Sequence, residues 1–195
     1  MCVSMSHISM SLFLYVSMSR CPRTLTWRDR TFMRPVNLKA VLRAMLKNGD
    51  SIGYVLLPTT STKNYSEAMR HRLAEKGVKD RDITRLQIDV ASSADACNAC
   101  LLPCLQFYDS THLATVKFYL TTVFGRGLVK RGGFIEDKFG QSQFRDIVEH
   151  GISAHAKWAT WLLEDGLGRA VGHLDGSKYS GEYSMAASTP WANRA

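Results

Sequence analysis

What the sequence lacks narrows the classes of protein that it can encode. It contains no apolar run of about 18 residues, so no membrane-spanning helix is predicted. It has only five cysteines, an odd number, and two of them, Cys2 and Cys21, lie in a segment of distinct composition. This cysteine usage argues against a disulfide scaffold and indicates a reducing compartment.

Acidic residues are also few, 17 against 25 Lys and Arg, which gives a net charge of +8. Such a charge favours polyanionic partners, either nucleic acid or a polyphosphate substrate. The other interpretation is a solvated basic surface without a specific partner.

The first 34 residues differ in composition from the rest of the chain. They are rich in Ser and Met and contain no acidic residue before Asp29. They also carry several arginines: Arg20, Arg23, Arg28, Arg30 and Arg34. This composition is typical of an organellar transit peptide, which predicts a plastid or mitochondrial location. The alternative is an untranslated or mispredicted leader on a cytoplasmic protein; in both cases we place residues 1–34 outside the folded domain.

Apolar periodicity and turn residues divide the remaining chain into helices and strands. Helices are predicted at 35–48, 65–76 and 92–102, and a last helix runs from the N-cap Ser142 to at least Leu162. Strands are predicted at 52–57, 83–90, 115–124 and 134–139. This order predicts an α/β (α+β) domain over 35–165, with helices flanking a mixed β-sheet. The Gly-, Ser- and Ala-rich residues 166–195 are expected to form a flexible C-terminal tail.

Acidic and basic residues fall at positions that suit phosphate chemistry. Asp82 begins one predicted strand and Glu136 lies on another. Two carboxylates from different strands suit a Mg²⁺ ion, which takes few protein oxygens and leaves room for phosphate. Lys63 and Arg70 flank the start of the helix predicted at 65–76, where backbone N–H groups and cations converge on a phosphate. A solvated basic helix is the alternative for these two residues.

A second set of candidates lies further along the chain. Tyr108 and His112 fall on one side of an extended segment, where an aromatic ring suits stacking on a base. Cys97, Cys100 and Cys104 are spaced like zinc ligands, with His112 eight residues on. The same spacing is also that of a buried helix face, and we favour this structural interpretation because free cysteine is often buried.

Taken in chain order, five short motifs resemble those of the synthetase domain of the RelA/SpoT family. Tyr65-Ser66 followed by Arg70 resembles Y-S-I-x-x-K-M, and residues 82–90 resemble D-I-x-A-x-R-I-I-V. Residues 103–112 are similar to P-K-x-N-G-Y-x-S-L-H. Glu136 precedes Glu149 as the acid of E-V-Q-I-R-T precedes A-E-x-G, and residues 149–155 resemble A-E-Y-G-I-A-A-H. The resemblance covers residues 58–165, and its last motif, which ends at His155, is the most specific.

This resemblance implies a nucleotidyltransferase-like mixed sheet and a (p)ppGpp synthetase of the stringent response. Such a GTP pyrophosphokinase transfers pyrophosphate from ATP to the 3′-hydroxyl of GTP or GDP. It implies that Asp82 and Glu136 hold Mg²⁺, with Glu136 also placed as a general base. It assigns further contacts: Ser66 and Arg70 at ATP phosphates, Tyr108 at guanine and His112 near the acceptor phosphates. Lys63 lies one position away from the paired basic residues that precede the Ser in the family. His155 is expected to have a structural role on the last helix.

Several cationic positions of the family hold other residues here: Cys104, Gln87 and Gly140. Cations supply much of the charge neutralisation in phosphoryl-type transfer. Three functions therefore stay open. They are an alarmone synthetase, weak or degenerate; a non-catalytic nucleotide-binding regulator; and a basic organellar protein that binds RNA or the ribosome. No membrane partner is predicted, and the sequence gives no oligomeric state.

Overall fold

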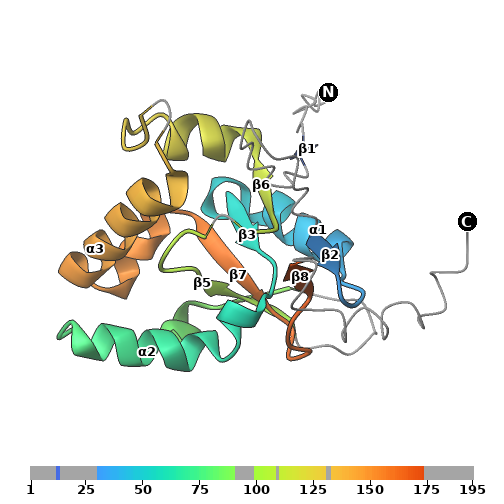
Figure 1. The fold of residues 1–195 in the computed structure, drawn as a ribbon, viewed down its shortest axis with the longest axis horizontal. Helices are drawn as coiled ribbons and strands as arrows, with labels where there is room; N and C mark the ends of the chain where they lie inside the picture. Colours follow the sequence, from blue (N-terminus) through green and yellow to red (C-terminus); the bar gives the residue numbers. More distant parts are fainter. Residues whose placement is uncertain (1–11, 14–29, 91–98, 109, 131–132, 174–195) are drawn as a thin grey trace, which may run out of the picture.

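The computed structural model describes residues 12–13, 30–90, 99–108, 110–130 and 133–173, and it shows a mixed α/β fold (Figure 1). Five strands form an open mixed sheet in the order β6-β3-β7-β5-β4. Their bounds are His112–Thr115 (β6), Tyr54–Leu56 (β3), Thr160–Glu164 (β7), Cys100–Pro103 (β5) and Ile88–Asp89 (β4). The two residues of β1 (Leu12–Phe13) pair with the outer edge of β6. The expected α/β class with a mixed sheet is confirmed.

The sheet is antiparallel except at its centre, where β3 and β7 run parallel. Tyr54 pairs with Thr160 in this parallel ladder. Successive side chains of a strand point to opposite faces, and in β7 Leu162 enters one core while Trp161 and Leu163 enter the other. The central strands are therefore buried on both faces.

Different elements cover the two faces of the sheet (Figure 1). One face packs against α2 (Tyr65–Glu75), α3 (Gln141–His150) and two π-type helical segments, η4 (Phe118–Val123) and η5 (Glu136–Gly140). The other face packs against α1 (Leu38–Asn48) and a small antiparallel sheet of β2 (Arg30–Phe32) and β8 (Val171–His173). This small sheet lies outside the predicted domain limits of 35 and 165. No helix among the described residues has the length and apolar composition that crossing a membrane requires.

The first two helices begin and end close to their predicted bounds. The Asn37 side chain accepts the N–H of Ala40 at 3.0 Å, so α1 starts at Leu38 rather than at Pro35. Gly49 follows its last residue with a φ of +54°, which stops the helix. The helix predicted at 65–76 is confirmed except for its last residue.

Residues 115–124 are not the predicted strand, although they are rich in β-branched and aromatic side chains. Only Thr115 belongs to a strand, and 118–123 form η4. The Thr115 hydroxyl accepts the N–H of Phe118 at 3.1 Å, and Phe118 then enters the core. Packing of this ring outweighs the local strand propensity.

The strand predicted at 134–139, which was to carry Glu136, is also absent. Glu136 starts η5 instead, and η5 runs directly into α3. The turn is held by Phe139, whose ring packs edge-on against Phe107 and Phe118 with centroids 5.3 and 6.1 Å apart.

The last predicted helix is too long. It ends at His150, where Gly151 takes a φ of +85°, and the short helix η6 (Ile152–Lys157) follows. Residues 160–164 form β7, the strand between β3 and β5. An apolar run of this length is compatible with a helix or a buried strand, and only its neighbours decide between them.

Two further predictions are wrong in part. Asp82 does not begin a strand but caps the 3₁₀ helix η3 (Ile83–Leu86), which replaces the first half of the strand predicted at 83–90. The helix predicted at 92–102 is contradicted from Cys100 onward, where β5 begins. Residues 92–98 lie outside the described residues.

Candidate functional site

A cavity of about 510 Å³ lies where the two parallel strands end, and we call it the α2 pocket. Pro58 and Thr59, which follow β3, line one part of it, and Leu163 and Glu164 at the end of β7 line another. In open sheets, ligands usually bind in the crevice beyond the carboxyl ends of parallel strands. Topology therefore singles out this cavity as the candidate site.

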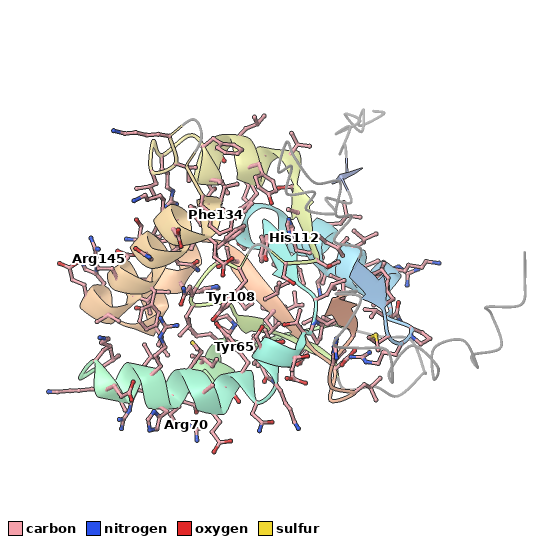
Figure 2. The ribbon with its side chains drawn as sticks, in the orientation of Figure 1. Tyr65, Arg70, Tyr108, His112, Phe134 and Arg145 are labelled. Atoms are coloured by element: carbon pink, nitrogen blue, oxygen red, sulfur yellow. The ribbon has the colours of Figure 1, made fainter. Side chains whose placement is uncertain are left out.

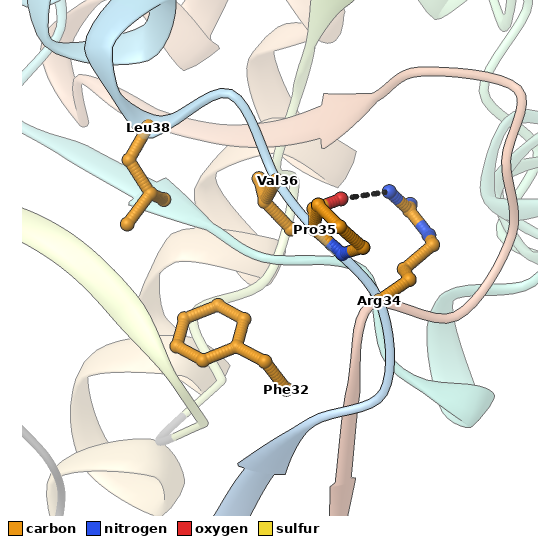
Figure 3. Close-up of a pocket in the computed structure, with 5 residues that line it drawn as sticks. All are labelled: Phe32, Arg34, Pro35, Val36 and Leu38. Carbon is orange, nitrogen blue, oxygen red and sulfur yellow. Dashed lines mark hydrogen bonds between the residues drawn. The ribbon is translucent and has the colours of Figure 1, made fainter. Parts of the chain in front are cut away.

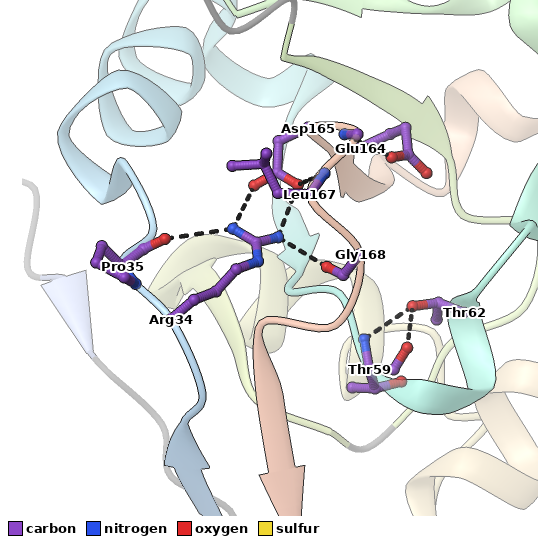
Figure 4. A network of polar contacts seen from close by, with 9 residues as sticks. Arg34, Pro35, Thr59, Thr62, Glu164, Asp165, Leu167 and Gly168 are labelled. Carbon is purple, nitrogen blue, oxygen red and sulfur yellow. Dashed lines mark hydrogen bonds and ion pairs between the residues drawn. The ribbon is translucent and has the colours of Figure 1, made fainter. Parts of the chain in front are cut away.

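The loop from β3 to α2 brings a helix N-terminus to the pocket. Thr59 and Thr62 form a capping box, in which the Thr59 N–H donates to Thr62 Oγ1 at 2.9 Å (Figure 4). Asn64 adopts a left-handed φ of 55°, and its side chain makes no cap hydrogen bond to α2. The first N–H groups of α2 therefore lack a side-chain cap, and the positive end of the helix dipole favours an anion there.

The loop after β7 forms the other side of the pocket. Gly166 and Gly168 line it with φ values of +69° and +71°, a conformation that favours glycine. Arg34 holds this loop in place (Figure 4): its guanidinium donates to both Asp165 carboxylate oxygens at 2.8 and 2.7 Å and to the Gly168 carbonyl at 2.7 Å. A bidentate pair of this kind fixes geometry as well as charge.

Two cationic side chains line the α2 pocket, Lys63 before α2 and Arg169 after β7. Glu164 is the one acidic residue among those that line it, and its Oε1 accepts the N–H of Gly166 at 2.9 Å. Ser66, in the first turn of α2, also lines the pocket. Two of the predicted substrate-binding residues, Lys63 and Ser66, thus line the same cavity.

Arg70 and Asp82 lie close to each other beside this pocket. Thr84, which lines the pocket, donates its hydroxyl and N–H to Asp82 Oδ1 at 2.6 and 3.1 Å. These hydrogen bonds hold the pKa of the Asp82 carboxyl below its ordinary value, and the charges of Arg70 and Arg85 lower it further. Asp82 is therefore an ionised carboxylate near the edge of the pocket. Figure 2 shows Arg70 on α2.

Tyr108 lies on the sheet face that α2 and α3 cover (Figure 2), and Glu136 is near enough for its charge to act on the Tyr108 phenol. The Tyr108 carbonyl accepts the Tyr54 hydroxyl at 2.6 Å, and the Tyr108 ring packs against the core. Burial raises the pKa of the Tyr108 phenol, the Glu136 carboxylate adds to this shift, and Arg72 opposes it. Stacking of Tyr108 on guanine, and a Mg²⁺ shared by Glu136 and Asp82, stay predictions.

His112 is buried, and both of its ring nitrogens are engaged. Nε2 forms a hydrogen bond with the Tyr119 hydroxyl at 2.7 Å, and Nδ1 forms one with the Ser110 carbonyl. The Tyr54 ring lies 4.6 Å away, centroid to centroid. A contact between His112 and acceptor phosphates requires this packing to open, and it stays a prediction.

The cysteine pattern forms no metal centre among the residues that the structure describes, where no group of three or more His, Cys, Asp or Glu side chains is placed to hold an ion. Cys104 lies in the core, and burial raises the pKa of its thiol to about 12. Cys100 lines the α2 pocket, and burial raises its thiol pKa too. Cys97 lies outside the described residues.

Sequence reasoning missed Arg169 and the glycine loop before it. The signal is present in the sequence as E-D-G-L-G-R directly after the apolar run 161–163. The sequence pattern predicts a helix over that run, which leaves the glycines in the predicted C-terminal tail. With the run as a strand, the same glycines mark a loop at the end of the sheet.

A second cavity, of about 340 Å³, lies against the segment that leads into α1 (Figure 3). Phe32, Val36 and Leu38 give it an apolar lining. Arg34 also lines it, but the guanidinium is committed to the Pro35 carbonyl and to Asp165. The α2 pocket is therefore the better candidate for a polar ligand.

Chemically, the α2 pocket offers what a phosphate group needs. Uncapped backbone N–H groups and the cations Lys63 and Arg169 face a cavity with a glycine loop and hydroxyl-bearing residues on its walls. No protein-family model, curated protein or solved structure matches the chain.

Proposed function

We propose that the protein binds a nucleoside polyphosphate in the α2 pocket, with ATP as the first ligand to test. The observation that carries the proposal is the meeting of Lys63, Arg169 and the uncapped start of α2 at the carboxyl ends of β3 and β7. Helix N-termini and cationic side chains both favour phosphate. The cavity volume of about 510 Å³ lies within the range of small-molecule sites.

The reaction that we propose for bound ATP is transfer of its pyrophosphate to the 3′-hydroxyl of GTP or GDP, on a sheet of the nucleotidyltransferase type. Support comes from the sequence motifs and from Lys63, Ser66 and Arg70, which lie in or beside the pocket. Asp82 and Glu136 would hold a Mg²⁺ ion that neutralises phosphate charge. Asp82 suits such an ion because its lowered pKa keeps the carboxylate ionised.

A nucleotide-binding regulator without catalysis is the second candidate, and Gly140 favours it. A Cβ at this position would lie 2.7 Å from the Phe107 carbonyl oxygen, so a side chain fits only if the backbone shifts. The synthetases of the RelA/SpoT family, which the motifs resemble, carry arginine there. Cys104, at another of their cationic positions, is buried in the core. Packing thus excludes two of the cations that would neutralise the transferred group.

Binding of ATP by the full chain, measured by isothermal titration calorimetry, tests the pocket. Lys63→Ala and Arg169→Ala each remove a charge-assisted hydrogen bond, worth about 1.5–3 kcal/mol, and are expected to raise the Kd by about tenfold or more. Lys76→Ala, at the opposite end of α2, is the matched control and is expected to bind normally. Full affinity in both pocket variants contradicts the proposal.

Turnover in the same samples separates the two candidates. The protein is incubated with Mg²⁺, ATP and labelled GDP or GTP. Product that disappears in Asp82→Asn and in Glu136→Gln supports the synthetase. ATP binding that depends on Lys63, without product, supports the regulator. Absence of both binding and product contradicts both candidates.

A further inference from the structure

In the segment from Phe118 to Phe139 the structure describes residues 118–130 and 133–139, and the first and last of these lie in the same part of the core. The ring centroids of Phe118 and Phe139 lie 6.1 Å apart. Midway, the Arg126 guanidinium lies 4.6 Å over the Trp158 ring, which anchors the segment to the α3 side of the domain. This segment therefore has a defined place on the surface.

Large apolar side chains are exposed along this segment. The exposed fractions are 64% for Leu120, 49% for Phe124 and 56% for Phe134. Leu120 lies on η4 and Phe124 is the residue that follows the end of η4. Phe134 precedes η5 (Figure 2). Among the described residues, the other large hydrophobics exposed to this degree are Leu46 and Leu167. Such a concentration indicates an interaction surface.

Exposed cations accompany these apolar side chains. Lys130 lies between Phe124 and Phe134 in the sequence, and Lys138 follows Phe134 by about one turn of helix. Both lysines are exposed. We call Leu120, Phe124, Phe134, Lys130 and Lys138 the 118–139 surface. The chain that carries it has a net charge of +8.

We propose that the 118–139 surface binds single-stranded nucleic acid, with bases stacked on Phe124 and Phe134 and phosphates beside Lys130 and Lys138. Exposed rings combined with cations are the two requirements for sequence-tolerant binding of a single strand. A duplex does not meet them, because its bases are already stacked on one another. None of these residues lines the α2 pocket, so the proposal is independent of nucleotide binding there.

Two other occupants fit this surface less well. A second copy of the chain would bring identical cations face to face, and like charges repel. A lipid surface is bound by a longer amphipathic helix with a continuous apolar face. Here η4 spans only Phe118–Val123, and its two end residues point into the core rather than outward.

The test measures fluorescence anisotropy of a labelled oligouridine of about 20 nucleotides, longer than the usual site of a single-strand-binding fold. Phe124→Leu and Phe134→Leu keep the apolar character and remove the ring, and each is expected to weaken binding about tenfold. Phe124→Tyr keeps an aromatic ring and is expected to bind the oligonucleotide as tightly as the unsubstituted protein does. Leu46→Ala, an equally exposed apolar residue on α1, is the matched control and is expected to bind normally.

The salt dependence of binding tests the cations. Lys130→Ala and Lys138→Ala are each expected to lower the slope of log K against log salt by about 0.7, while Lys47→Ala on α1 leaves it unchanged. The same oligonucleotide as a duplex, and vesicles of phosphatidylserine and phosphatidylcholine, test the other occupants.

Four outcomes overturn the proposal. They are full affinity in both leucine variants, an equal loss in Leu46→Ala, a preference for the duplex, and binding to vesicles without binding to the oligonucleotide. Circular dichroism of each variant checks that these exposed substitutions leave the fold intact.

Discussion

The two ends of the parallel strands β3 and β7 are built in opposite ways. At the carboxyl ends, the α2 pocket is open and lined by glycines, hydroxyl-bearing residues and charged side chains. At the amino end of β7, the polar residues Gln143, His155 and Thr160 are buried. Gln143 Nε2 donates to Thr160 Oγ1 and to the Cys104 carbonyl, both at 2.6 Å, and His155 Nε2 donates to the Thr160 carbonyl.

This difference shows that residue type alone does not identify a functional group. His155 and Gln143 hold helical segments to the sheet and have no access to a ligand. Lys63 and Ser66 reach a cavity. At this amino end, which we call the closed end, Gln143 Nε2 and His155 Nε2 are used up by contacts within the protein, whereas Lys63 and Ser66 at the open carboxyl end line a cavity that a ligand can enter.

The largest predicted effect is a loss of stability in acid, and it arises from His155 at the amino end of β7. Burial lowers the pKa of His155 to about 4, against about 6.5 in the unfolded chain. The unfolded state then binds more protons between these values, so stability present above pH 6.5 falls as the pH drops towards 4, by up to about 3 kcal/mol. Urea unfolding at several pH values measures this loss.

His155→Gln is expected to remove that pH dependence, because glutamine does not titrate. His150→Gln changes an exposed histidine and is the control that should keep it. Hydrogen bonds hold the pKa values of Asp82 and Asp146 below the ordinary Asp value, so the stability that these carboxylates contribute is lost only at a pH lower than the range in which His155 acts. The prediction is wrong if the unfolding free energy of His155→Gln depends on pH as strongly as that of the unsubstituted protein.

The same residue type at the two ends gives the second prediction. Gln143→Ala removes a fully buried amide with two hydrogen bonds and is expected to cost about 2–3 kcal/mol of unfolding free energy. Gln87→Ala, at the exposed edge of the α2 pocket, is expected to change it by less than about 0.5 kcal/mol. Denaturant unfolding measures both variants. Equal losses of unfolding free energy in Gln143→Ala and Gln87→Ala would contradict the difference in structure that we describe between the two ends of the strands.

A smaller loss of stability than that of Gln143→Ala is expected from a substitution at Gly140, the residue before α3. Alanine normally stabilises a helix relative to glycine by about 1 kcal/mol. Here its Cβ would meet the Phe107 carbonyl oxygen at 2.7 Å, so Gly140→Ala is expected to destabilise by about 1–2 kcal/mol. Thermal unfolding measures this effect, and the melting temperature of Gly140→Ala is expected to lie below that of the unsubstituted protein. A more stable Gly140→Ala variant would show that the contact relaxes freely.

The parts of the fold that the sequence predicts well depend on neighbours along the chain. α1 has a cap in Asn37, an apolar period and a stop at Gly49, and α2 has equally local signals. The run 52–57 contains β3 because it is short, apolar and ended by Pro58. Each of these signals acts within a few residues, so no partner need be known.

The wrong predictions concern segments whose secondary structure depends on contacts with residues distant in the sequence. Residues 160–164 are a strand because β3 and β5 lie on either side, and residues 118–123 are helical because Phe118 packs on Phe139 and Tyr54. In the candidate site, Lys63 and Ser66 are predictable because they lie close to each other in the sequence, around the start of one helix. Arg169 was missed because it joins them only through the pairing of β3 with β7.

By itself, the sequence determined the basic charge, the α/β class and the helix that follows Lys63 and carries Ser66. These follow from composition and from interactions between near neighbours in the chain. Only the tertiary structure decided that residues of 58–66 and of 163–169 line one pocket, and that Glu136 starts a helix. Contacts between distant residues set burial, and burial decides which polar groups stay available for a ligand.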